Sequence, residues 1–415
     1  MKPVRFSLLL LLTLCAQPSR ADRDGWSFNP LPIAGYDSDF GLMFGGYVDL
    51  NCFGGLYPSY RHRFCAEVLV YSRHASAYTL EYDSQYLIPG IRTQAKVYFD
   101  DNPLYQFYGF NGSVLDYDRN LNLNRDRGIA YYSYDRQYLN LQVELSGNIS
   151  GHLSWTARPS FWQYRIRELN WNGYDPDNTL FRQYRQAGLI EDGEADGGNV
   201  LELKAGLKYD TRDIEAAPSR GIYADVNIDA APDIFGTGYD YLKIAARLRH
   251  YVSLGTERVV LAYSLAYQST LAGNPAFYSQ PYILHSKPTE GLGGATTLRG
   301  VLFNRLTGND YLWSNVELRT RIFDFHFLGR RVFAVATPFL DAGMVTSPFR
   351  PDRQAAFTGL SASDLNEKAR RLHASYGIGA QLVIDYNFIP TIMFGIPFDR
   401  NDGDYGLYMT IDYTF

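Results

Sequence analysis

The sequence predicts an all-β protein, a transmembrane antiparallel β-barrel of about 16 strands, and three observations support this. First, many segments alternate strictly between apolar and polar residues, as β-strands with two unlike faces do. Second, aromatic residues make up 15% of the chain, with 34 Tyr, and no long apolar run follows the first residues. Third, connections between the alternating segments are short on one side and long on the other, which is typical of outer-membrane barrels.

The N-terminus has the features of a signal peptide. Lys2 and Arg5 precede an apolar run at 6–14 that is too short to span a bilayer, and Ser-Arg-Ala at 19–21 offers a cleavage site. We therefore expect residues 1–21 to be removed; an N-terminal membrane anchor is the alternative. Removal takes away three positive charges and changes the formal net charge from -5 to -8. An acidic chain without a basic stripe argues against nucleic-acid binding.

The alternation itself is consistent with two architectures. In a soluble sandwich the apolar face packs inward, whereas in a membrane barrel it contacts lipid and the polar face lines the lumen. The alternating segments run roughly 10–14 residues, which is long for a sandwich and suits tilted membrane strands. The clearest of them lie at 201–210, 242–249, 311–322, 376–385 and 405–415.

The connections favour the membrane barrel. The short ones are 73–76, 147–151, 254–257 and 387–390, and the long polar ones are about 170–198, 271–310 and 345–372. We expect the barrel to comprise residues 41–415, with residues 22–40 forming an extended periplasmic lead-in. The strand count includes 114–126, where Asp and Asn alternate with apolar residues, although this polar series could instead be a loop.

Two cysteines, Cys52 and Cys65, remain after removal of the signal peptide. They flank a Gly-Gly-Leu-Tyr-Pro turn and could face each other across a hairpin. In an oxidising compartment this predicts a disulfide, with two unpaired thiols as the alternative.

Several motifs occur in an order that resembles the BamA-like superfamily of outer-membrane assembly factors and two-partner secretion pores. A short-turn signature includes Asp210, Arg212 and Asp213, and Thr-Thr-Leu-Arg-Gly at 296–300 resembles the family's long-loop motif, with Val301 in place of its aromatic residue. Strand motifs follow at 315–319, 339–343 and 377–379. The resemblance covers nearly the whole mature chain.

The resemblance implies that the long extracellular loop folds into the lumen and that Arg299 docks on the inner wall. The alternation adds that Glu317 and Asp341 face the lumen on the two strands after the loop. A buried guanidinium needs acidic partners, and we expect Arg299 to pair with one or both, while Gly300 permits close approach to the wall. An exposed loop arginine is the alternative. The glycine-rich segment 291–300 lacks the Lys-Ser/Thr and the strand-turn-helix setting of a phosphate-binding loop.

By resemblance, the protein acts in the bacterial outer membrane, in biogenesis or in transport or insertion of protein or lipid. The family's terminal assembly signal maps to Tyr413 and Phe415, which implies recognition by the barrel-assembly machinery, and outer-membrane lipid surrounds the barrel. Residues 22–40 are too short for a POTRA domain, so a periplasmic partner would supply that role. The family's weak seam would join 41–51 to 405–415; the alternative is that glycines in the first strand make room for aromatic neighbours.

Other functions have less support. A passive pore or a surface-exposed binding scaffold is the alternative function. The seven His form no short-spaced ligand pair and no nucleophile elbow is present, so we expect no metal, no cofactor, no catalytic residues and no enzyme activity.

Overall fold

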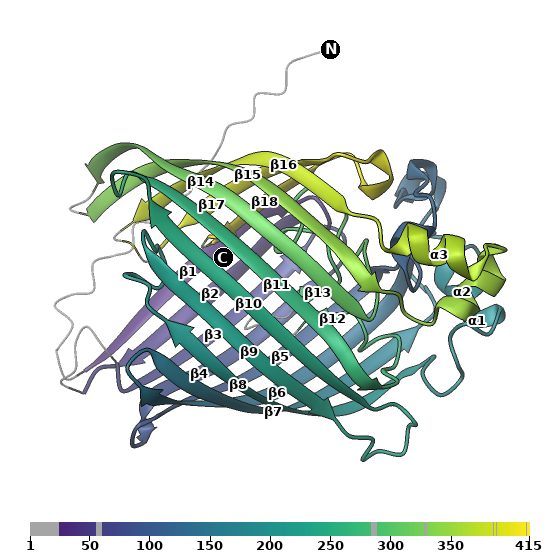
Figure 1. Ribbon diagram of the computed structural model, residues 1–415, viewed down its shortest axis with the longest axis horizontal. Coiled ribbons are helices and arrows are strands. Elements are labelled where there is room, and N and C mark those ends of the chain that lie inside the picture. Colours follow the sequence, from purple (N-terminus) through teal and green to yellow (C-terminus); the bar gives the residue numbers. More distant parts are fainter. Residues whose placement is uncertain are drawn as a thin grey trace, which may run out of the picture.

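The computed structural model describes residues 25–54, 60–283, 289–327, 330–384, 386, 388–411 and 413–415. In these residues 16 strands form one closed antiparallel barrel, in which each strand pairs with its neighbours along the chain and β1 closes the ring against β18 (Figure 1). The fold class predicted from the alternation is therefore confirmed. The predicted signal peptide at 1–21 lies outside the described residues.

The first eight barrel strands are β1 (Trp26–Asp37), β2 (Gly41–Cys52), β3 (His62–Tyr71), β4 (Ser76–Ile88), β5 (Ile91–Gln106), β6 (Ser133–Ser150), β7 (Leu153–Arg167) and β8 (Gly197–Asp210). The other eight are β9 (Gly221–Ala231), β10 (Tyr241–Ser253), β11 (Val259–Gly273), β14 (Asp310–Phe327), β15 (Arg330–Ser347), β16 (His373–Ile384), β17 (Pro390–Pro397) and β18 (Gly406–Ile411). The connections carry a small sheet, β12 (Tyr282–Ile283) and β13 (Thr289–Glu290), the helices α1 (Leu180–Gln186), α2 (Pro351–Thr358) and α3 (Ala362–Ala369), and the 3-10 turns η1 (Gly112–Val114), η2 (Arg119–Leu121), η3 (Arg125–Arg127) and η4 (Arg400–Asp402).

The two faces of the strands differ as a membrane barrel requires. On β8, Leu203 and Leu207 are each 51% exposed on the outer face. The residues on either side of Leu203, Glu202 and Lys204, are buried on the inner face. Apolar side chains therefore contact lipid and charged side chains line the lumen, which excludes the soluble sandwich. No helix among the described residues is long and apolar enough to cross a membrane.

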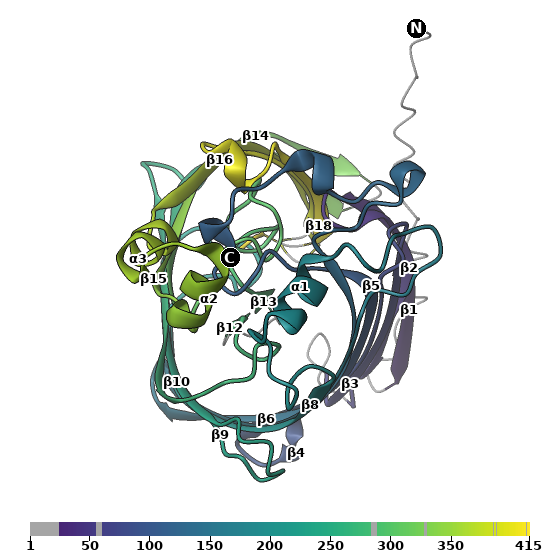
Figure 2. The same ribbon diagram turned by 90° about the vertical axis from the view of Figure 1, so that its right-hand side faces the viewer.

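The long connections gather at one end of the barrel, which is the extracellular end of such proteins. Figure 2 shows α1 and α2 spread across this end. Aromatic residues from four of these connections or the adjoining strand ends pack into one buried cluster there, including Phe107, Phe110, Phe181, Tyr184 and Phe277. The turn between β3 and β4, at 72–75, lies at this end as well, so its assignment to the short-turn side was wrong.

The first barrel strand begins earlier than predicted. Trp26–Asp37 form β1, which pairs along its whole length with β2, so the assignment of residues 22–40 to a lead-in before the barrel is wrong over this strand. Trp26 and Phe28 face outward with Ser27 between them turned inward, which is the usual alternation. Pro30 and Pro32 argued against a strand here, because proline is rare in strands other than edge strands.

The polar series at 114–126 is a loop and not a strand. Its short side chains hydrogen-bond to the nearby backbone: Asp118 accepts from the Asn120 N–H and Asn124 from the Arg127 N–H, and each interaction starts a 3-10 turn. Such bonds compete with a strand ladder. The predicted strand number was nevertheless right, because the missed β1 replaced this segment.

The predicted disulfide is absent, and both cysteines are free. In the register of β2 and β3, Cys52 lies opposite His62 and Cys65 lies opposite Asp49. The two thiols are thus three positions apart along the ladder and on opposite faces of the wall, since side chains alternate. The Cys65 thiol instead contacts Tyr47 Oη at 3.1 Å and Asp49 Oδ1 at 3.3 Å, on the inner face.

This register predicts two free thiols in the folded protein. A chain from which residues 1–21 have been removed should react with two equivalents of maleimide when it is unfolded without reductant. Its migration in gels should not depend on reductant. A Cys65→Ser variant should react with one equivalent. Oxidised wild-type protein that takes up no maleimide would contradict the register.

Candidate functional site

The barrel is closed by a short seam between β1 and β18. A single residue pair, Asp37 with Tyr408, joins these strands, whereas β1 and β2 share twelve pairs. Just above it, the Ser38 N–H donates to the Leu407 carbonyl at 3.0 Å and the Leu407 N–H donates to Ser38 Oγ at 2.7 Å. These contacts lie at the extracellular end, and among the described residues of β1 and β18 no residue pair follows them toward the periplasm.

The loop between β11 and β14 contacts both sides of this seam. The Gly300 N–H donates to Tyr408 Oη on β18 at 3.2 Å. The Phe303 N–H donates to Asp39 Oδ1, in the turn between β1 and β2, at 3.1 Å. The segment Arg299–Arg305, called the seam loop below, therefore fastens the extracellular end of the seam.

Arg299 is fully buried and ion-paired with both acids that the sequence singled out. Its Nε and Nη2 donate to the two carboxylate oxygens of Asp341 at 2.8 and 2.7 Å, and its Nη1 donates to Glu317 Oε1 at 2.5 Å. Glu317 Oε2 also accepts from Arg319 Nε at 2.8 Å, and the Arg299 guanidinium lies 3.6 Å from the centre of the Phe339 ring. The bidentate pair with Asp341 fixes the plane of the guanidinium as well as its position.

Gly300 lies against the backbone of β17. Its φ is 99°, in the region that favours glycine, and a Cβ here would lie 2.6 Å from the Gly395 carbonyl carbon. A Cβ on Gly395 would in turn lie 2.4 Å from the Arg299 carbonyl oxygen. Two glycines are thus needed for the seam loop to contact the wall this closely.

The end of the chain joins the same cluster. Arg299 Nη1 donates to Thr414 Oγ1 at 3.1 Å, and Arg319 Nη2 donates to the Phe415 main-chain oxygen at 2.8 Å. The Arg319 guanidinium lies 3.9 Å from the centre of the Tyr413 ring. The Phe415 ring packs against three inward-facing residues of β10 and β11: Tyr251, Val260 and Ala262. Tyr413 and Phe415 therefore lie inside the barrel and do not extend β18; their role as an assembly signal stays a prediction.

Further anchors hold the same loop to β5, β6 and β10, and sequence reasoning missed them. Glu290 accepts from Arg136 Nη1 on β6 at 2.6 Å and from Tyr105 Oη on β5 at 2.5 Å. Lys243 on β10 donates to the Gln280 carbonyl at 3.2 Å. No motif marks these residues, because their contacts depend on the path of the loop and not on local pattern.

Arg305 is a second buried arginine of the seam loop. In the described part of the chain its guanidinium donates to main-chain carbonyls and not to a carboxylate: the acceptors are Gly112, Leu115 and Asn401 at 2.6, 2.8 and 3.0 Å. Burial lowers its pKa. These bonds tie the seam loop to the connection between β5 and β6 and to the one between β17 and β18.

The predicted short-turn signature is local in its contacts. Arg212 donates to both carboxylate oxygens of Asp210 at 3.0 and 2.7 Å. Asp213 accepts from the N–H groups of Ile214 and Ser219, both at 2.9 Å. Burial acts to raise the pKa of Asp213, but hydrogen bonds from Ser219 and the turn backbone outweigh it and lower this pKa. These residues shape the turn between β8 and β9, on the periplasmic side.

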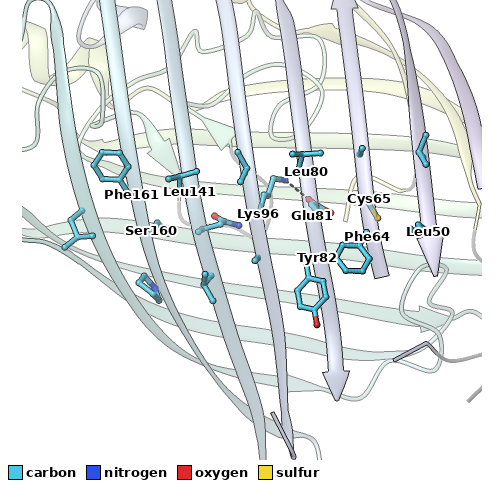
Figure 3. A pocket seen from close by; sticks show the side chains of 18 residues that line it. Leu50, Phe64, Cys65, Leu80, Glu81, Tyr82, Lys96, Leu141, Ser160 and Phe161 are labelled. Atoms are coloured by element: carbon cyan, nitrogen blue, oxygen red, sulfur yellow. Dashed lines mark ion pairs between the residues drawn. The ribbon is translucent and has the colours of Figure 1, made fainter. Parts of the chain in front are cut away.

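An apolar depression lies elsewhere, on the lipid-facing surface of β2 to β8. Its volume is about 720 Å³, and Figure 3 shows Leu50, Leu80, Leu141 and Phe161 around it. The Lys96–Glu81 ion pair drawn beneath, at 2.8 Å, belongs to the inner face of the wall. The depression is therefore part of the lipid-contacting surface and separate from the seam.

Apolar outer face, charged lumen and long extracellular loops define a bacterial outer-membrane β-barrel. The Omp85 superfamily domain matches residues 69–415, and the chain belongs to that superfamily.

Two solved structures share the fold. BamA from Haemophilus ducreyi lacking POTRA domains 1–3 has a TM-score of 0.59 at 15% identity, over 94% of this chain and 70% of that one. CdiB from Escherichia coli has a TM-score of 0.58 at 13% identity, over 92% of this chain and 62% of that one, so the chain spans less than two thirds of CdiB. No curated protein matches the sequence at a significant level.

Loss of Arg299 should destabilise the barrel strongly. Arg299→Met leaves Asp341 buried without a cation, and removing one partner of a buried pair costs about 3–5 kcal/mol in the free energy of unfolding. Arg299→Met with Asp341→Asn should regain part of this loss. Urea unfolding in lipid vesicles, followed by tryptophan fluorescence, measures both. Arg258→Met is the control, since that side chain is 55% exposed and paired with Asp324. Equal losses of stability at Arg299 and Arg258 would contradict the stabilising role of the buried Arg299–Asp341 pair.

Ionisation of the buried Asp39 carboxyl should destabilise the turn that contacts the seam loop as the pH becomes alkaline. Burial, reinforced by the nearby Asp37 carboxylate, raises the pKa of Asp39 to about 8, although the Phe303 N–H and Arg73 lower it. Its contribution to stability is complete below the ordinary pKa of about 4 and is lost as pH rises through 8. Proteolysis within the seam loop should therefore increase between pH 7 and pH 9 in the wild type and not in Asp39→Asn. The same increase in both would refute this.

Proposed function

We propose that the protein opens laterally at the seam of β1 and β18 to insert or move protein or lipid in the outer membrane. The observation that carries this proposal is the single residue pair at the seam. Every other pair of neighbouring barrel strands shares at least six pairs among the described residues. The strand ladder stabilises a barrel wall, so the wall separates at the seam with the smallest loss of hydrogen bonds.

The contacts at the extracellular end of the barrel favour a lateral route for the cargo over an axial route through the lumen. A buried aromatic cluster joins the connections there, and the loop between β11 and β14 is anchored on β14 through Arg299 and on β6 through Glu290. An axial route would require many of these contacts to break together. The alternative, a passive pore, would instead give large and steady conductance in planar bilayers.

Family membership supports the same class of function. Omp85 superfamily barrels are insertion or transport barrels and are generally not enzymes. We infer that this chain acts by opening and binding and not by catalysis. Because BamA and CdiB work in outer-membrane insertion or transport, we infer that a periplasmic partner delivers the cargo to the seam.

Closing the seam covalently should abolish function. Extending the register of Asp37 with Tyr408 by two residues would place Gly35 opposite Thr410, so a Gly35→Cys and Thr410→Cys pair should form a disulfide across the seam. In a strain that depends on this variant, oxidation should lower outer-membrane protein or lipid to the level seen on depletion, and reductant should restore it. Background variants Cys52→Ser and Cys65→Ser remove the native thiols.

The matched control places the two cysteines within the continuous wall, at Gly35 and Met43, which are paired on β1 and β2. That disulfide should leave membrane composition unchanged. If depletion of the protein itself changes neither protein nor lipid of the outer membrane, the proposed function is wrong.

A further inference from the structure

Two prolines lie on the edge of β1 that faces the seam. Along a strand, alternate residues direct their N–H and C=O groups to opposite neighbours. Ser38 directs its N–H toward β18, as its bond to the Leu407 carbonyl shows. Pro30 and Pro32 share the parity of Ser38, so their nitrogen atoms face the seam as well. Because proline has no N–H, this edge lacks two successive donors in its periplasmic half.

The missing donors fall where the end of the chain would pair. If the register of the seam continued toward the periplasm, Pro32 would lie opposite Tyr413 and Pro30 opposite Phe415. The carbonyls of Tyr413 and Phe415 would then receive no hydrogen bond from β1. Inside a bilayer a carbonyl without a hydrogen-bond donor is strongly unfavourable, so this pairing is disfavoured.

The end of the chain is bound elsewhere. The Phe415 main-chain oxygen, which would lack a donor beside Pro30, accepts from Arg319 at 2.8 Å. Thr414 accepts from Arg299 at 3.1 Å, and the Phe415 ring lies 6.4 Å from the Tyr251 ring, centre to centre. The lumen therefore supplies the donors and the apolar contact that β1 cannot.

We propose that Pro30 and Pro32 keep the periplasmic half of the seam unpaired and divert residues 413–415 into the lumen, where they join the Arg299 cluster. The purpose of this arrangement rests on the proposed function, but the arrangement itself does not. It couples the seam to the seam loop, because Arg299 binds Asp341 on the wall and Thr414 in the diverted segment.

Restoring the two donors tests this directly. Pro30→Thr with Pro32→Thr should let residues 413–415 pair with β1, and hydrogen exchange of the amides at 413–415 and 34–36 should slow about tenfold or more. Ala34→Thr is the matched control, since Ala34 has the same parity and already carries an N–H; it should leave exchange unchanged. Unchanged exchange in the double variant would overturn the proposal.

A cross-link gives a second readout on the same protein. Leu31→Cys and Thr414→Cys are opposed in the extended register and should form a disulfide only when Pro30 and Pro32 are both Thr. Equal cross-linking with and without the prolines would overturn the proposal. Cys52→Ser and Cys65→Ser provide the background.

If the double variant does not assemble, Tyr251→Ala provides another test, because it removes the contact between the Tyr251 and Phe415 rings. Exchange at 413–415 should then rise about tenfold while exchange at 34–36 stays unchanged, because the prolines still prevent pairing. Slowed exchange at 34–36 would show that β1 can accept the segment, which would overturn the proposal. These measurements need no cargo, so a normal membrane after depletion would refute the proposed function and leave the result at the prolines standing.

Discussion

The buried charge of Arg299 is the constraint on which the arrangement of the lumen depends. A guanidinium removed from water is tolerated only beside carboxylates, and Asp341 and Glu317 are the acids that contact it. Because the fork of Arg299 binds Asp341 through two parallel bonds, both the position and the orientation of the seam loop are set. Gly300 is then held against β17, where only a residue without a side chain fits.

The same constraint makes the two ends of the seam unlike. With Arg299 in place, the seam loop reaches Tyr408 on one strand and Asp39 beside the other, so the extracellular end is joined by more than its own strand pair. At the periplasmic end no such support is found among the described residues, and the donors that a ladder would need are absent at Pro30 and Pro32. Any strand laid along this edge in the same register would lack the same two donors.

The sequence allowed the wall to be predicted because the signal is local. A period of two assigns each residue to lipid or lumen, which placed Glu317 and Asp341 inside together. The family resemblance then implied that Arg299 docks on the wall beside them. Prediction failed where register or path decides the outcome. Cys52 and Cys65 flank a turn, but the register of β2 and β3 puts them on opposite faces. Glu290, Arg305 and Phe415 bind through segments whose course no local pattern specifies.

The short seam is therefore a consequence of competing partners and not of a poor strand. In a bilayer every backbone carbonyl must be satisfied within the protein, and a barrel normally achieves this by closing its ladder. Here the end of the chain has two possible sets of partners, β1 on one side and the lumen on the other. The prolines weaken the first set, and Arg319 with Tyr251 supplies the second. A barrel that satisfies its last residues internally can leave its wall open at one place without leaving those residues unpaired.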